Sequence, residues 1–221
     1  MMTMNKKTVV AFSLLTAISA SSAFAAPPAM PKDGSWGQGA SDASFDAMMQ
    51  SGFQDKGIAK LDRLNQDATQ KLCSNPFTAY SEKNAALREK LQAENQASIK
   101  YPADGKMMGD WKNGEKIAQS GRGLTWTDKA DTVNGGNCYN CHQITKEELS
   151  YGTIGPSLYN YGKLRGNSED VVKYTWGKIY NAKATNLCSL MPRAGAKGVL
   201  SEAQIRDLVA LLLDPESPVN K

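Results

Sequence analysis

The stretch Asn134-Gly-Gly-Asn-Cys-Tyr-Asn-Cys-His-Gln-Ile144 contains two of the four cysteines of this chain and its only histidine. Two cysteines separated by two residues can form a redox-active dithiol or supply half of a zinc site. With a histidine directly after them, they can also attach a haem covalently. The rest of the sequence decides between these three interpretations.

The dithiol and zinc interpretations need neighbours that the sequence lacks. A dithiol of this spacing usually lies near a βαβ unit, and no alternating run here predicts a strand. A zinc site needs further ligands nearby, but the chain has one histidine and no second Cys-x-x-Cys. The haem interpretation uses the whole motif, with Cys138 and Cys141 as thioether positions and His142 as an iron ligand. We therefore predict one covalently attached haem c.

The second axial ligand of the iron must be another residue type, because no second histidine exists. Met191 lies in a predicted loop between two helices, where Pro192 and Gly195 favour an extended backbone that presents the thioether. A thioether opposite a histidine raises the reduction potential, which suits an electron carrier. We predict Met191 as this ligand.

Other sulfur ligands stay open at this stage. The remaining candidates after residue 25 are Met30, Met48, Met49, Met107, Met108 and Cys188. Met48 and Met49 lie on an apolar helical stripe and are expected in a core. Met107 and Met108 precede the first helix of the haem-binding half and remain the alternatives to Met191.

The first 25 residues have the pattern of a secretory signal peptide. Lys6 and Lys7 precede an apolar run over residues 8–18, and small residues lead to Ala25. The run is shorter than the ~20 residues of a membrane span, so cleavage after Ala25 is favoured over a retained anchor. Cleavage lowers the formal net charge from +4 to +2, and no Lys/Arg cluster indicates nucleic-acid binding. We expect a periplasmic protein without a membrane span.

The chain is expected to be all-α, with a signal peptide over 1–25, an extension over 26–105 and a haem domain over 106–221. In the extension, a Pro/Gly/Ser-rich lead-in precedes a helical hairpin over 41–99. In the haem domain, apolar periodicity predicts three helices, one over 110–119, one that Ser168 caps and one that Ser201 caps.

The haem domain resembles a class I cytochrome c. The segment "TIGPSLYN" (153–160) matches the Gly-Pro-x-Leu segment of that family. The resemblance implies that the Pro156 carbonyl accepts a hydrogen bond from His142, which orients the imidazole. It also implies that Gly114 lies where the first and last helices of the domain cross.

A closer resemblance extends from about Gly114 to the C-terminus. The segments "GNCYNCHQI", "YGTIGPSLYNYGKLRG" and "CSLMPRAGAKGVLSEAQIRDLVALLLDPESPVN" together look like the SoxX family, the monohaem subunit of SoxAX complexes in bacterial sulfur oxidation. The resemblance implies a heterodimer with SoxA, action on the SoxYZ carrier, and a downstream cytochrome as electron acceptor.

The resemblance implies a role as the electron-accepting subunit of an L-cysteine S-thiosulfotransferase. SoxAX joins thiosulfate to a carrier cysteine, and the thiol that performs this chemistry belongs to SoxA. We therefore expect no catalytic residue in this chain. The alternatives are a free-standing cytochrome c electron carrier and a non-haem protein that binds a metal or is held by disulfides.

Two further predictions concern the cysteines outside the motif and Arg165. In an oxidising compartment Cys73 and Cys188 are expected to pair, although a bridge to a partner, a free thiol or a distal thiolate stay open. Arg165 lies near several tyrosines in the sequence and is a candidate partner for haem propionates. Those tyrosines could equally form ordinary core or face a partner protein.

Overall fold

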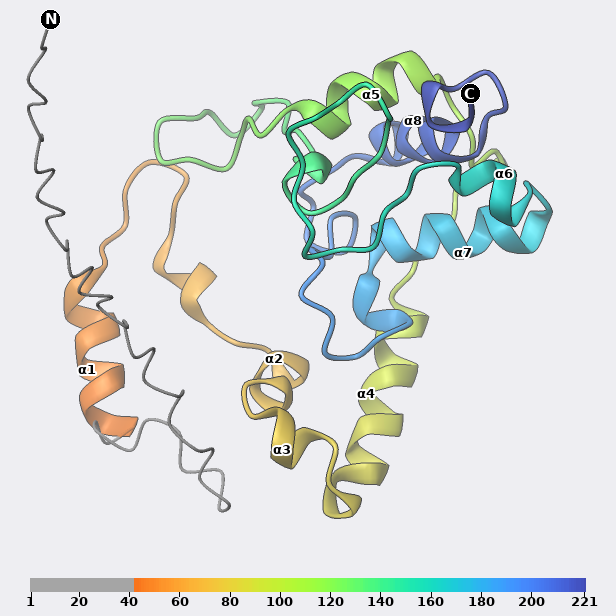
Figure 1. Ribbon diagram of the computed structural model, residues 1–221. Helices are drawn as coiled ribbons and strands as arrows, with labels where there is room; N and C mark the ends of the chain where they lie inside the picture. Colours follow the sequence, from red (N-terminus) through yellow and green to blue (C-terminus); the bar gives the residue numbers. More distant parts are fainter. Residues whose placement is uncertain (1–41) are drawn as a thin grey trace, which may run out of the picture. The chain divides into compact units, whose positions relative to one another are not determined.

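The computed structural model describes residues 42–221, which belong to one compact unit (Figure 1). This part of the chain is all-α, with eight helices and no strand, as predicted. The predicted signal peptide and the whole lead-in, including Met30, lie outside the described residues. The predicted boundary after residue 105 stays a prediction.

Four helices lie in the extension and four in the second half of the chain. The extension contains α1 (Asp42–Gly52), α2 (Ala68–Cys73), α3 (Pro76–Ala79) and α4 (Ala85–Ala97). The second half contains α5 (Trp111–Gln119), α6 (Tyr161–Arg165), α7 (Glu169–Tyr180) and α8 (Glu202–Leu213). Short 3₁₀ turns connect them, among which η3 (Cys138–Asn140) and η4 (Ala182–Ala184) matter for the site.

The three helices predicted in the haem domain are present with the expected starts. The Asp110 side chain accepts from the Lys112 N–H at the start of α5, and Ser168 is the N-cap of α7. Ser201 and Gln204 form a reciprocal capping box at the start of α8. The sequence missed α6, which begins after Asn160 in the left-handed conformation.

The extension is not the two-helix hairpin that the sequence predicts. After α1, the backbone turns at Gly57, whose φ of +53° is left-handed, and only a 3₁₀ turn follows before α2. Asp67 then starts α2 afresh through a capping box with Gln70. The expectation that Met48 is buried is also wrong, because its side chain is 56% exposed.

The apolar core lies in the second half, among α5, α7 and α8 and the residues after η3. Trp176 of α7 is completely buried, and Ile205, Val209 and Leu211 of α8 are nearly so. Helices α5 and α8 pack directly against each other (Figure 1). Tyr139 of η3 belongs to the same cluster, so the cysteine-containing turn is attached to this core.

Gly114 lies at the crossing of α5 and α8, as predicted. A Cβ atom there would collide with the backbone carbonyl of Asp207 and approach Cβ of Leu211 to 2.9 Å. The two helix backbones are therefore as close as a glycine permits.

Replacement of Gly114 by alanine is expected to lower the free energy of unfolding by about 1–3 kcal/mol, because the helices must separate. Urea denaturation measures the change. Asn113→Ala on the exposed face of α5 is the matched control. Equal denaturation midpoints for the two variants would contradict the close approach.

Candidate functional site

Cys138, Cys141 and His142 lie together on one tight turn. The turn η3 starts after Asn137, which has a left-handed φ of 51°, and ends at Cys141. The backbone N–H groups of Cys141 and His142 both donate to the carbonyl of Cys138, at 3.1 and 3.0 Å. Both cysteines are free thiols. The turn therefore presents two thiols and one imidazole from five consecutive residues.

The loop that contains the Gly-Pro segment lies along this turn. The Gly152 N–H donates to the Tyr139 carbonyl (2.8 Å), and the Gly155 N–H donates to the Cys141 carbonyl (2.8 Å). The Leu158 N–H donates to the Gln143 carbonyl (2.7 Å). These bonds fix Pro156 next to the imidazole, although the two segments are separated in the sequence.

His142 is oriented by this loop. Nδ1 of His142 lies 2.8 Å from the carbonyl oxygen of Pro156. A carbonyl only accepts hydrogen bonds, so Nδ1 carries the proton and Nε2 of the neutral ring keeps its lone pair. Gly155 is tight against the same ring, because a Cβ atom at this position would overlap the imidazole. The arrangement holds an imidazole with a free Nε2, the form that binds a metal.

The thiol of Cys138 is not set up as a redox nucleophile. Burial, and to a lesser extent the nearby Cys141, raises the pKa of Cys138 to about 12. Reactive dithiols instead have a cysteine whose pKa is lowered towards neutrality. This environment argues against the dithiol interpretation of the motif.

Met191 is partly buried and packs against the same core as Cys138. It lies between α7 and α8, after η4, as expected from its position in the sequence. Met107 also packs against this core, whereas Met108 is exposed. The structure thus brings Cys138 and Met191 to one core and leaves Met107 as the second thioether there.

Arg165 makes contacts that the sequence did not predict. Its guanidinium lies over the rings of Tyr161 (5.2 Å) and Tyr174 (5.8 Å). It ends α6 and is exposed to solvent. These contacts with Tyr161 and Tyr174 are cation–π interactions. The contact of Arg165 with haem propionates stays a prediction.

The disulfide between Cys73 and Cys188 is present, as predicted. The two Cα atoms lie 5.3 Å apart, although 115 residues separate them in the sequence. The bond joins the end of α2 to the segment that precedes Met191. Cys188 is therefore not a free thiolate, which removes it as an axial ligand.

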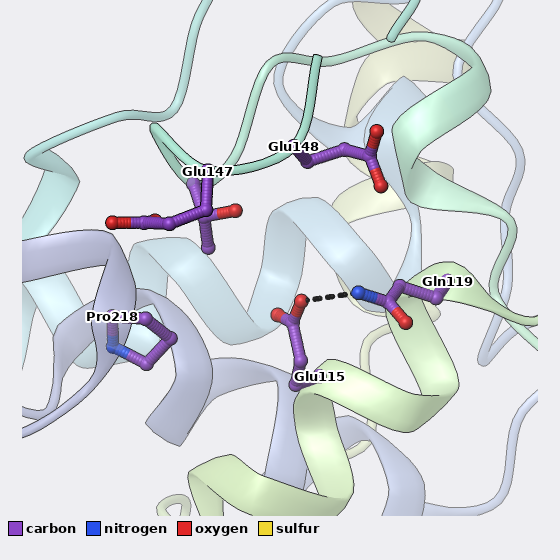
Figure 2. A pocket seen from close by; sticks show the side chains of 6 residues that line it. Glu115, Gln119, Glu147, Glu148 and Pro218 are labelled. Carbon is purple, nitrogen blue, oxygen red and sulfur yellow. Dashed lines mark hydrogen bonds between the residues drawn. The ribbon is translucent and has the colours of Figure 1, made fainter. Parts of the chain in front are cut away.

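An acidic hollow of about 280 Å³ lies beside the turn but contains none of the predicted site residues. Figure 2 shows Glu147 and Glu148 on one side and Glu115 with Gln119 on the other. The Glu115 carboxylate accepts hydrogen bonds from Gln119 (2.7 Å) and from the hydroxyl of Tyr139 (2.8 Å). The bond from Tyr139 anchors the turn to α5. Sequence reasoning did not identify this anchor.

Two negative findings concern the described residues 42–221. They contain no group of three or more His, Cys, Asp or Glu side chains that could hold a metal ion. The zinc interpretation therefore lacks a ligand set there. Within the same residues, every helix is too short or too polar to cross a bilayer.

Comparison with known proteins places the chain in a family. No family model matches it. It is 40% identical over 157 residues to a protein of Aquifex aeolicus (strain VF5) named "uncharacterized lipoprotein". The alignment covers 71% of this chain and 73% of that protein. The chain therefore belongs to the same family as this Aquifex lipoprotein.

Proposed function

We propose that the chain is a class I cytochrome c with one haem c attached to Cys138 and Cys141. The observation that carries the proposal is the hydrogen bond of 2.8 Å between Nδ1 of His142 and the Pro156 carbonyl. It leaves Nε2 of His142 available as a donor to iron, directly after two free thiols. This donor set supports the c-type haem interpretation of the motif.

Each residue has a defined task in this proposal. Cys138 and Cys141 would form the two thioether bonds, and His142 and Met191 would bind the iron. The Pro156 carbonyl and Gly155 fix the plane of the imidazole. The chemistry that a bound haem supplies is one-electron transfer.

The specific role that we propose is that of SoxX, the electron-accepting subunit of a SoxAX complex. Formation of a sulfur–sulfur bond between thiosulfate and a carrier cysteine releases two electrons and the thiol proton. This chain would take up these electrons from SoxA and pass them to a downstream cytochrome. The support is the order of the three matching segments, which lie around η3, on the loop before α6 together with α6, and on the region from Cys188 to the C-terminus.

Export to the periplasm is part of the proposal. The relative from Aquifex aeolicus is named a lipoprotein, which supports a location in the cell envelope for the family. The Cys73–Cys188 disulfide also fits an oxidising compartment.

A free-standing cytochrome c carrier is the second candidate function. The same haem site serves both functions, so the site does not separate them. Partner binding separates the two functions. A SoxX subunit is expected to co-purify with a SoxA-type cytochrome, and a free carrier is not.

The deciding experiment is affinity purification of the tagged chain from thiosulfate-grown cells. We expect a haem-stained band for the chain on a denaturing gel and a SoxA-type cytochrome in the same fraction. Thiosulfate should then reduce the haem of this chain in the presence of SoxYZ. A haem-loaded chain that purifies alone would support the free carrier and refute the SoxX role.

Met191→Ala is expected to abolish the far-red charge-transfer band of methionine-ligated ferric haem and to lower the reduction potential. The physical reason is the loss of a soft sulfur ligand that favours reduced iron. The matched variant is Met107→Ala, since Met107 packs against the same core. Survival of the band in Met191→Ala with loss in Met107→Ala would reassign the ligand.

A further inference from the structure

The segment that carries Met191, residues 182–197, has little regular structure of its own. Only η4 at its start is helical. Lys183 is buried there, and its ammonium donates to the carbonyls of Leu187 (3.3 Å) and Ser189 (3.0 Å). A segment of this kind needs contacts from outside to keep one conformation. We call residues 182–197 the Met191 segment.

The extension provides a charged contact to this segment. Arg193, two residues after Met191, forms an ion pair with Asp67 at 2.6 Å. The Arg193 side chain is only 11% exposed. Asp67 also accepts from the Gln70 N–H as the N-cap of α2. One carboxylate therefore ties the start of α2 to the Met191 segment.

A buried polar network adds a second contact. The Asn181 amide, directly before the segment, donates to Oδ1 of Asn95 (3.1 Å) and to Oγ of Ser98 (2.8 Å). Asn95 in turn donates to Oγ1 of Thr69 (3.0 Å). The network thus links α2 and α4 to Asn181, the N-cap of η4. Buried hydrogen bonds of this kind require one relative position of their partners.

Two further residues of the extension, Gln92 and Cys73, reach the segment directly. The Gln92 side chain of α4 donates to the backbone carbonyls of Lys183 (3.0 Å) and Ala184. The disulfide from Cys73 is attached three residues before Met191. The contacts thus reach the segment on both sides of Met191.

We propose that the extension is a clamp that positions Met191, with Asp67 and Arg193 as the positioning pair. The contacts are polar and directional, unlike the apolar packing between α5 and α8. They therefore fix the backbone path of the Met191 segment, whereas apolar packing would only enlarge the core. The part of this proposal that concerns iron ligation rests on the proposed function.

Asp67→Asn is the sharpest test variant. Asparagine keeps an N-cap oxygen for α2 but removes the charge that pairs with Arg193. The matched control is Glu94→Gln, which removes a carboxylate of an exposed ion pair with Lys90 on α4. Arg193→Lys is a milder second variant, since it keeps the charge and loses the guanidinium.

Hydrogen exchange of the purified full-length chain measures how firmly the extension holds the Met191 segment. This measurement does not require a bound haem. In Asp67→Asn we expect backbone amides 185–197 to exchange roughly tenfold faster, with α5 and α8 unchanged. Glu94→Gln should exchange like the wild type. Equal rates in all variants, or a uniform rise that includes α5 and α8, would overturn the clamp.

The far-red methionine band of the ferric, haem-loaded chain measures the positioning of Met191. We expect a weaker band in Asp67→Asn, partial recovery in Asp67→Glu, and the wild-type band in Glu94→Gln. Faster exchange with an unchanged band would overturn the positioning of Met191. If the chain carries no haem at all, the proposed function fails, and the exchange data alone still decide the clamp.

Discussion

Substitution of both Cys138 and Cys141 by alanine is expected to remove all covalently bound haem from the chain. The thioether bonds survive denaturation, whereas axial coordination by His142 does not. A haem stain on a denaturing gel therefore changes from positive to negative. Either single substitution leaves one thioether position and should keep part of the stain.

The matched control for this experiment is the other pair of cysteines. Replacement of Cys73 and Cys188 by serine removes the disulfide but leaves η3 intact. This variant should keep the full haem stain. A wild-type chain that shows no stain after expression with a haem-attachment system would refute the proposed cofactor.

Loss of the Cys73–Cys188 disulfide is expected to lower the free energy of unfolding by about 4–5 kcal/mol in the chain-entropy treatment. The reason is the length of the loop, since 115 residues separate the two cysteines. Without the bond, the unfolded chain gains conformational freedom, and the extension is no longer held covalently to the Met191 segment.

Urea denaturation of three samples checks this prediction. These are the oxidised wild type, the wild type under a reductant, and the Cys73→Ser, Cys188→Ser double variant. The second and third samples should have the same lowered midpoint. A midpoint within experimental error of the oxidised wild type would show that other contacts hold the extension in place.

The sequence predicted those parts of the fold that depend on neighbouring residues. Helices α5 and α8 begin where Asp110 and Ser201 predict, because a cap acts on the backbone N–H groups two or three residues ahead. The spacing of Cys138, Cys141 and His142 likewise needs no tertiary information. Each of these signals is complete within one turn of the chain.

The extension shows where local signals were insufficient. Its apolar spacing predicted a continuous helix before Cys73, but Gly57 and the Asp67 capping box divide it. The apolar residues around Met48 were expected in a core, yet the described unit leaves Met48 exposed. Helical periodicity identifies an apolar face, and only tertiary contacts decide whether that face is covered.

By itself, the sequence determined the helical class, the caps of the main helices and the turn that carries Cys138, Cys141 and His142. The resemblance implied the Pro156 carbonyl as the partner of His142, and tertiary structure alone brought it to Nδ1, through the bonds from Gly152 and Gly155 to the turn. It also decided that Asp67 pairs with Arg193 of the Met191 segment and that Asn95 accepts a hydrogen bond from Asn181, directly before that segment. The reason is physical. Caps and motifs act within a few residues, whereas these contacts form only after distant segments have packed together.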